Sequence, residues 1–150
     1  MKLYLPRKTL ALCVGALMLG ANLVQAATNL PPIHRSGRIE YLTGGVGLAE
    51  STAIQSASKE WPLTLEFAIK DKKSADFAAD VNVVVSDTHH HPELKVTSGG
   101  PFLLAKVKPG KYTVAATLAG KTLHKQVVVT TGMPTKVEFL WPTGTGETHS

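Results

Sequence analysis

GGPFLLAKVKPGKYTVAATL, residues 99–118, is the stretch of sequence that decides the expected fold. Two alternating runs, residues 102–107 and 111–118, flank a turn at Pro109 and Gly110. In such a turn proline presets φ at the first corner and glycine accepts a positive φ at the second, so we expect a β-hairpin here. The second run has the period of two of a strand buried on one side, because one of its faces carries Tyr112, Val114, Ala116 and Leu118.

Residues 1–26 have the pattern of a secretory signal peptide. A basic start precedes the apolar core LALCVGALML, and VQA at residues 24–26 fits the small-x-small cleavage rule, which predicts a mature chain that begins at Ala27. The apolar run is shorter than the roughly 20 residues that cross a bilayer, so we expect no stable membrane span after cleavage, with an uncleaved anchor as the alternative. The expected location is the bacterial periplasm or the extracellular space.

Cysteine usage and charge narrow the class of protein further. Cys13 is the single cysteine and lies inside this leader, so we expect neither a disulfide nor a catalytic thiol in the mature chain. Lys2, Arg7 and Lys8 also belong to the leader, and without them 13 basic residues face 11 acidic ones, which lowers the formal charge from +5 to +2. The remaining basic residues are scattered singly, so a nucleic-acid-binding surface is not expected. About 124 residues remain after cleavage, which suits one domain.

Three segments of the mature chain are not expected to be strands. Residues 27–38, which contain two consecutive prolines, predict an extended N-terminal arm, and residues 143–150 predict a polar tail. Residues 48–59 predict either a short helix or an irregular crossover. In the helical interpretation one side carries Leu48, Ile54, Ala57 and Trp61.

The rest of the mature chain consists of short alternating runs separated by turn signals. Besides the two runs of the quoted stretch, strands are expected at residues 39–42, 63–70, 81–86, 93–98, 123–129 and 136–141. Seven or eight such runs in about a hundred residues predict an all-β fold. We expect an antiparallel two-sheet sandwich of about seven strands over residues 39–142.

A family resemblance covers about half of the chain. ADVNVVVSD at residues 79–87 is followed by a turn and by KVTSGGPFLLAKVKPGKYTVAATLAGKTLHKQVVVTTGMPTKVEFLW at residues 95–141. Over about residues 76–141 the chain resembles the carboxypeptidase regulatory-like domain family, and P-G-x-Y-x-V-x-A is the specific part of the match. The matching positions are Val81, Val83, Asp87, Gly99, Phe102, Leu104, Val107, Pro109, Gly110, Tyr112, Val114, Ala116 and Gly120.

This resemblance implies a transthyretin-like, or prealbumin-like, sandwich of seven strands. Members of the family usually serve as accessory or interaction modules without catalysis of their own, and Pro109, Gly110 and Tyr112 would belong to a structural turn. Related sandwiches include starch-binding-like domains, so carbohydrate is an implied ligand. Residues 87–91 replace the usual D-G-x turn, and residues 43–47 lie outside the family core.

The run His89-His90-His91 is the one unusual feature of the composition. On an extended loop His89 and His91 would point the same way and His90 the opposite way, and neutral imidazoles bind zinc, copper or nickel. A metal site needs a third ligand, for which the candidates are Asp87, Glu93 and His124. The alternative is a solvated hairpin tip with incidental metal affinity.

Glycines after the first expected strand form a second candidate site. Gly45 and Gly47 match half of a dinucleotide fingerprint, but Glu50 stands at the position of the third glycine and no βαβ unit follows. We therefore expect no nicotinamide cofactor, and no other cofactor. One interpretation is a rim loop in which the bare backbone of Gly44, Gly45 and Gly47 contacts a ligand together with Tyr41 and Glu50. The other is a turn that needs positive φ.

Catalytic patterns do not occur in the sequence. It has no G-x-S-x-G elbow, no H-E-x-x-H motif and no cysteine nucleophile in the mature chain, so we do not expect an enzyme. The leading hypothesis is a non-catalytic module that contacts a protein or cell-envelope component through an exposed sheet edge or the loops at one end. One alternative is carbohydrate binding through exposed Trp61, Trp141 or Tyr112, although we expect the two tryptophans as buried anchors. Metal binding through His89 and His91 is the other.

Overall fold

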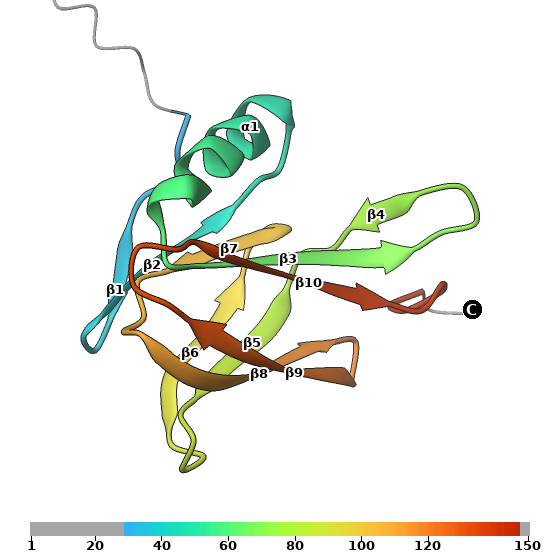
Figure 1. The fold of residues 1–150 in the computed structure, drawn as a ribbon. Coiled ribbons are helices and arrows are strands. Elements are labelled where there is room, and N and C mark those ends of the chain that lie inside the picture. Colours follow the sequence, from blue (N-terminus) through green and yellow to red (C-terminus); the bar gives the residue numbers. More distant parts are fainter. Residues whose placement is uncertain (1–28, 148–150) are drawn as a thin grey trace, which may run out of the picture.

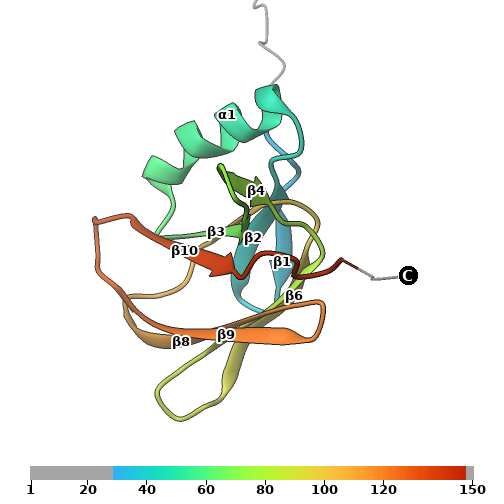
Figure 2. The same ribbon diagram turned by 90° about the vertical axis from the view of Figure 1, so that its right-hand side faces the viewer.

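A computed structural model describes residues 29–147 of the chain (Figure 1). These residues form two β-sheets that face each other, and one short helix lies on the outside of the first sheet (Figure 2). The all-β, two-sheet sandwich expected from the sequence is confirmed. The leader expected over residues 1–26 lies outside the described residues, and so do residues 148–150.

The first sheet has six strands and the second has four. The first contains β1 (His34–Ser36), β2 (Ile39–Gly44), β3 (Leu63–Lys70), β4 (Ala75–Phe77), β7 (Phe102–Ala105) and β10 (Thr135–Trp141). Its order is β1-β2-β7-β3-β10, and β4 pairs with the end of β3. The second contains β5 (Val81–Ser86), β6 (Pro92–Ser98), β8 (Gly110–Leu118) and β9 (Lys121–Val129). Its order is β6-β5-β8-β9.

The hairpin predicted around Pro109 and Gly110 is wrong, because its two arms lie in different sheets. β7 pairs with β2 and β3 in the first sheet, whereas β8 pairs with β5 and β9 in the second. Every residue of β7 is buried, because the second sheet covers one of its faces and the helix layer covers the other. Residues 106–109 therefore form a corner that carries the chain from one sheet to the other.

One strand pair departs from the expected antiparallel arrangement. β10 runs parallel to β3, in a register that extends from Thr135 opposite Leu63 to Trp141 opposite Ile69. Residues 130–134 leave β9 and cross to the first sheet at the end where β3 begins, so β10 starts beside the first residue of β3 and follows its direction. The other strand pairs among residues 29–147 are antiparallel, as expected.

Alternating apolar side chains of both sheets fill the main core. Phe67, Phe139 and Trp141 lie at its aromatic centre with ring centroids 6.0–6.2 Å apart, and all three are fully buried. Full burial of a large apolar side chain contributes about 1.5–3 kcal/mol. The predicted inner face of β8 is confirmed, since Val114 and Ala116 are fully buried and Tyr112 packs against the same core.

A second apolar cluster holds the helix against the first sheet. Helix α1 (Leu48–Ala57) continues into the 3₁₀ turn η1 (Ser58–Glu60), so the helical interpretation of residues 48–59 is confirmed. The buried members of this cluster are Leu42, Ile54, Trp61, Phe102 and Leu104. Leu48 was expected on the same side but is 84% exposed, because it is the first helical residue and stands outside the turn that contacts the sheet.

The two flanking segments are more ordered than their sequences suggested. Within the segment expected as an extended arm, residues 34–36 form β1, which pairs with β2, and Leu30 packs against the second cluster. At the other end Thr145 is buried and its amide and hydroxyl both donate to the carbonyl of Pro142. The described part of the expected polar tail therefore begins as a turn against the sandwich.

Candidate functional site

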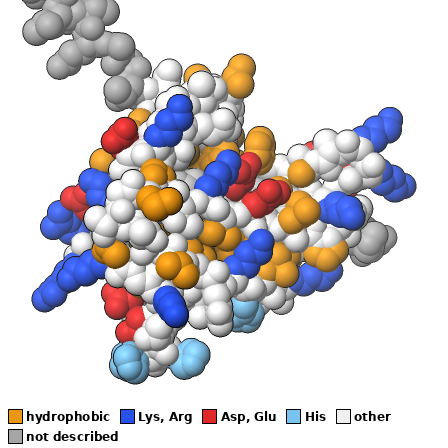
Figure 3. Space-filling model, in the orientation of Figure 1, with side chains coloured by type: hydrophobic (Ala, Val, Ile, Leu, Met, Phe, Trp, Pro, Cys, Tyr) orange, Lys and Arg blue, Asp and Glu red, His pale blue; other side chains and the backbone are white. Residues whose placement is uncertain are grey.

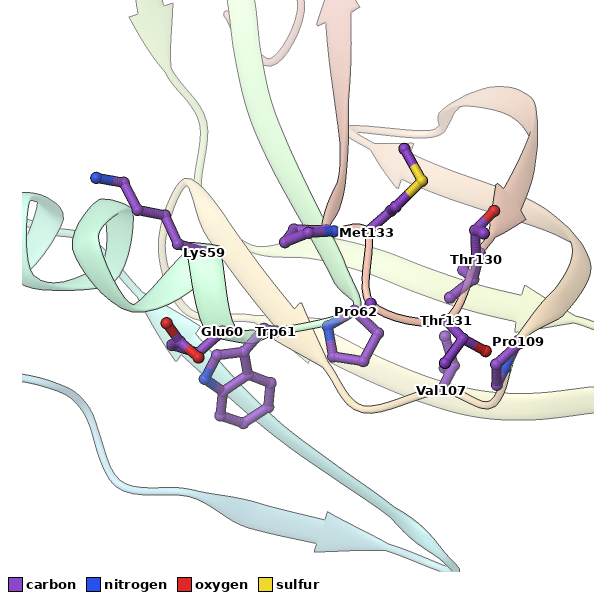
Figure 4. Close-up of a pocket in the computed structure, with 12 residues that line it drawn as sticks. Lys59, Glu60, Trp61, Pro62, Val107, Pro109, Thr130, Thr131 and Met133 are labelled. Carbon is purple, nitrogen blue, oxygen red and sulfur yellow. The ribbon is translucent and has the colours of Figure 1, made fainter.

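Three connections meet at one end of the sandwich and enclose a pocket of about 380 Å³ (Figure 4). They are the segment from η1 to β3, the corner between β7 and β8, and the connection between β9 and β10. We call this the loop-end pocket, which is lined by residues 59–62, Val107, Pro109 and residues 129–134. Ligand pockets in proteins typically have volumes of roughly 300–1,000 Å³, so this one is of the size that holds a ligand group.

The loop-end pocket has an apolar wall. Trp61, Met133 and Pro62 contribute to it together with two further prolines and two valines, while Lys59 and Glu60 are the ionisable residues of the lining. Met133 is 65% exposed, and its flexible thioether side chain adapts to varied apolar partners. Lys106 lies next to this wall, with its Nζ 5.0 Å from the centre of the Trp61 ring. The pocket is therefore suited to bind an apolar group rather than to transfer a proton.

The sequence did not single out this pocket, because its residues come from three connections that are far apart along the chain. Each of these connections contains a proline, and a proline between two strands is typical of an ordinary turn. The one available signal was Met133, a large apolar side chain in the connection between the strands expected at residues 123–129 and 136–141.

The glycine-rich loop is held by the side chain of Glu50 from the first turn of α1. Glu50 Oε1 accepts a hydrogen bond of 2.7 Å from the Gly45 amide. Gly45 has a φ of 100°, and a Cβ added there would overlap the Phe102 ring, so the loop approaches the sheet more closely than other residues allow. Gly47 has a φ of 88° at the start of α1. These contacts favour the interpretation as a turn that needs positive φ.

Tyr41 lies apart from Glu50 and the glycines. Its side chain packs against the main core, and its ring lies 5.6 Å from that of His34, whereas Leu42 and the helix occupy the other face of β2. The structure thus brings Gly44, Gly45 and Glu50 together and leaves Tyr41 on the opposite face of the sheet. A ligand-binding role for these residues stays a prediction.

The histidine run forms the tip of the β5–β6 hairpin, at the bottom of the molecule in Figure 3. Asp87 Oδ1 accepts hydrogen bonds from the amides of His89 (2.8 Å) and His91 (2.9 Å). The bond from the His91 amide is the main reason why the pKa of Asp87 lies below its ordinary value. The rings of His89 and His91 stack with centroids 6.1 Å apart, so they lie on one side of the loop as the spacing predicted.

Pro109, Gly110 and Tyr112 form the corner between the sheets. The Tyr112 hydroxyl donates a hydrogen bond of 2.6 Å to the carbonyl of Lys108, and the Tyr112 ring lies over Gly110. Partial burial of the ring raises the pKa of Tyr112, and the nearby carboxylates of Glu93 and Asp87 raise it further. The P-G-x-Y motif therefore closes a corner, although it does not make the hairpin that its spacing suggested.

Side chains close one margin of the sandwich, where β9 and β10 lie next to each other. Lys125 donates to the backbone carbonyl of Glu138, and Trp141 Nε1 donates a bond of 2.9 Å to the carbonyl of Lys121. These bonds occupy backbone acceptors that an added strand would need. At the opposite margin β1 has only three residues, which leaves β6 as the longer open edge.

The two tryptophans are buried, as expected. Trp141 is fully buried and Trp61 is 6% exposed, so neither presents a ring face on which a sugar could stack. Tyr112, the third aromatic residue considered for carbohydrate binding, is partly buried and its hydroxyl is engaged at the corner.

Ionisable side chains in the described part of the chain do not form a three-ligand metal arrangement. Between residues 29 and 147, no group of three His, Cys, Asp or Glu side chains is placed to hold a metal ion. The His91–Asp87 pair has a 3.6 Å separation between Nδ1 and Oδ2, and it lies on the exposed hairpin tip rather than in a cleft. The absence of catalytic activity stays a prediction.

Comparisons with known proteins do not assign a family. No protein-family model matches the chain, and a search of curated proteins finds no match. The resemblance to the carboxypeptidase regulatory-like domain family therefore remains a hypothesis that rests on the motif residues, chiefly Pro109, Gly110 and Tyr112.

Proposed function

We propose that this protein is a non-catalytic module of the periplasm or the extracellular space that binds a protein of the cell envelope through the loop-end pocket. The observation that carries this proposal is an apolar pocket whose rim holds Met133, a large side chain that is 65% exposed. Aromatic side chains that enter such pockets are frequent anchors of protein interfaces.

The pocket suits an apolar anchor of a partner for two reasons. Its wall of Trp61, prolines and valines is already formed by the fold, so little conformational entropy is lost when a side chain enters it. Lys59 and Glu60 carry opposite charges in the lining, and Lys106 beside the wall pairs with Glu40 (2.9 Å), so the surroundings of the pocket are close to neutral and favour an apolar anchor over a charged one.

Strand addition at the β9–β10 margin is the less favoured route. Lys125 and Trp141 already bond to backbone carbonyls there. The leader pattern of residues 1–26 supports a location outside the cytoplasm, and neither helix of the described residues is long and apolar enough to span a membrane.

Site-specific photocrosslinking tests this proposal. A benzophenone amino acid is placed at Met133 in one variant and at Phe77 in a matched control, and the protein is expressed in its native cells. Phe77 is similarly exposed (57%) but lies on β4, which pairs with the far end of β3 from the pocket. We expect a discrete protein adduct from position 133, and we expect Met133→Asp to abolish co-purification of the same protein. Adducts from position 77 alone, or from neither position, would contradict the proposal.

The carbohydrate-binding alternative has less support, because both tryptophans are withdrawn from the surface. A glycan array probed with the purified protein distinguishes it from protein binding. Glycan binding that persists in Met133→Asp would favour a carbohydrate site elsewhere and would count against the loop-end pocket.

A further inference from the structure

The hairpin tip at residues 87–91 is an ordered loop, although it is exposed. Asp87 accepts hydrogen bonds at its side chain from two amides of the tip, its own amide donates to the carbonyl of His91 (3.0 Å), and its carbonyl accepts from the amide of His90 (3.1 Å). Four hydrogen bonds around one residue fix the backbone from which the histidine side chains project. The loop therefore fixes the backbone of His89 and His91 on either side of His90, while their exposed rings stay free to rotate.

His90 differs from its two neighbours in backbone conformation and in the side of the loop on which its side chain lies. Its φ of 63° lies in the left-handed region, which non-glycine residues adopt rarely. His90 lines a hollow next to β8 and β9, together with Lys111 and Tyr112, whereas His89 and His91 do not line it. The stacked pair of His89 and His91 thus forms one side of the loop, and His90 belongs to the other.

Polar groups lie near one ring nitrogen of each histidine. The Nδ1 atom of His91 lies 3.6 Å from Asp87 Oδ2, and the Nδ1 atom of His89 lies 3.5 Å from the Thr88 hydroxyl. A carboxylate near Nδ1 favours the neutral tautomer that carries its proton there and leaves the Nε2 lone pair of His91 to a metal. The Thr88 hydroxyl can donate or accept, so it leaves either ring nitrogen of His89 available to the same ion.

The distance between the rings is compatible with a shared ion. A ring nitrogen lies about 1.1 Å from the centre of an imidazole and about 2.1 Å from a bound metal, so two imidazoles on one ion have centres about 4.5 Å apart at a right angle and about 6.4 Å apart in line. The observed distance of 6.1 Å lies within this range. The side chain of His91 is 79% exposed, and exposed side chains change rotamer within nanoseconds, so rotation of the rings lets a nitrogen of each reach one ion.

We propose that His89 and His91 bind one divalent transition-metal ion through one ring nitrogen each, with water in the remaining positions, and that Cu²⁺ is the ion bound most tightly. Two nitrogens and water suit the tetragonal preference of Cu²⁺, which also stands highest in the Irving–Williams order. Zinc sites in proteins usually have three or four protein ligands, and residues 29–147 do not bring three candidate ligands together. This site lies at the hairpin tip and is independent of the loop-end pocket.

Calorimetric titration of the purified protein with CuCl₂ and ZnCl₂ at pH 7.5 tests the proposal. We expect one Cu²⁺ per chain, bound more tightly than Zn²⁺. Because each histidine supplies half of a chelate, His89→Ala and His91→Ala should each weaken Cu²⁺ binding about tenfold or more. The matched control is His90→Ala, which removes the same side chain from the same loop and should leave the affinity within about twofold on the same chelate reasoning.

A second measurement locates the ion. Cu²⁺ broadens amide resonances around it, and we expect selective loss of the resonances of residues 88–92 before any other signal. Equal losses of affinity in His89→Ala and His90→Ala would overturn the proposal, because they would indicate an unstructured histidine run. So would broadening centred on His124 or on the chain termini. Thermal unfolding of each variant checks that the fold is intact, which we expect because the altered rings are exposed.

Discussion

Removal of a single hydroxyl by Tyr112→Phe tests whether the P-G-x-Y motif acts as a corner between the sheets. The change deletes the 2.6 Å hydrogen bond to the Lys108 carbonyl and keeps the ring that packs on the core. A hydrogen bond of this kind contributes about 0.5–1.5 kcal/mol net. Lys108 is exposed and water can replace the lost donor, so we expect a loss in the lower half of this range, about 0.5–1 kcal/mol.

Urea unfolding followed by tryptophan fluorescence measures this loss. We expect a lower midpoint with an unchanged m value, because the surface exposed on unfolding stays the same. Tyr41→Phe is the matched control, since it removes a phenol hydroxyl from a partly buried ring on β2 that takes no part in the corner. Equal stability of wild type and Tyr112→Phe, or an equal loss in the control, would refute the role that we assign to the hydroxyl.

The same variant has a distinct pH dependence. Burial raises the pKa of Tyr112 above the ordinary tyrosine value of 10.0, so the folded state favours the protonated phenol. The contribution of the protonated Tyr112 phenol to the free energy of unfolding is complete below about pH 10 and is lost as the pH rises through the raised pKa. We therefore expect the stability difference between wild type and Tyr112→Phe to shrink above pH 10. A difference that stays constant up to pH 11.5 would contradict this reasoning.

Three further predictions concern the helix layer and the hairpin tip. Ile54→Ala removes the fully buried anchor of α1 and should cost about 2–5 kcal/mol in urea unfolding, and a loss below about 1 kcal/mol would show that the helix does not depend on it. Gly45→Ala should be more destabilising than Gly47→Ala, because both have positive φ but only Gly45 would place a Cβ against Phe102; equal thermal midpoints would contradict this. Hydrogen bonds from the loop amides lower the pKa of Asp87 below its ordinary value of 3.8. The hairpin tip should therefore stay ordered just below pH 3.8 and lose its order as the pH falls through the lowered pKa. An NMR titration of the tip amides checks this. Asp87→Asn should remove this pH dependence.

Local patterns in the sequence predicted the faces of the strands and the positions of several turns. The alternation along β3 and β8 identified Phe67 and Val114 as core residues, and the turn at Gly120 separates β8 from β9 as expected. These features depend on neighbouring residues only, since side chains alternate across any strand and glycine is the residue that most readily adopts a positive φ. His89 and His91 lie on one side as expected, but on a turn in which His90 has a φ of 63° and not on the extended loop from which the arrangement was predicted.

The candidate sites could be predicted only in part. Glu50 and Gly45 were named together and are in contact, but the structure shows the carboxylate bonded to the loop itself, and Tyr41 lies on the other face of β2. The loop-end pocket was not predicted, because no local pattern connects Trp61 with Met133. A site assembled from distant connections becomes visible only when the sheets are in place.

Alternation of apolar and polar residues along short runs was enough to predict a two-sheet sandwich with apolar inner faces, because burial of alternating side chains requires a second layer. The neighbours of each strand, in contrast, could be read only from the folded chain. β7 is buried on both faces and takes its place between β2 and β3, so residues 106–109 turn a corner between sheets where turn chemistry predicted a hairpin. Strand pairing is chosen by the total burial of the chain, and no short stretch of sequence contains that information.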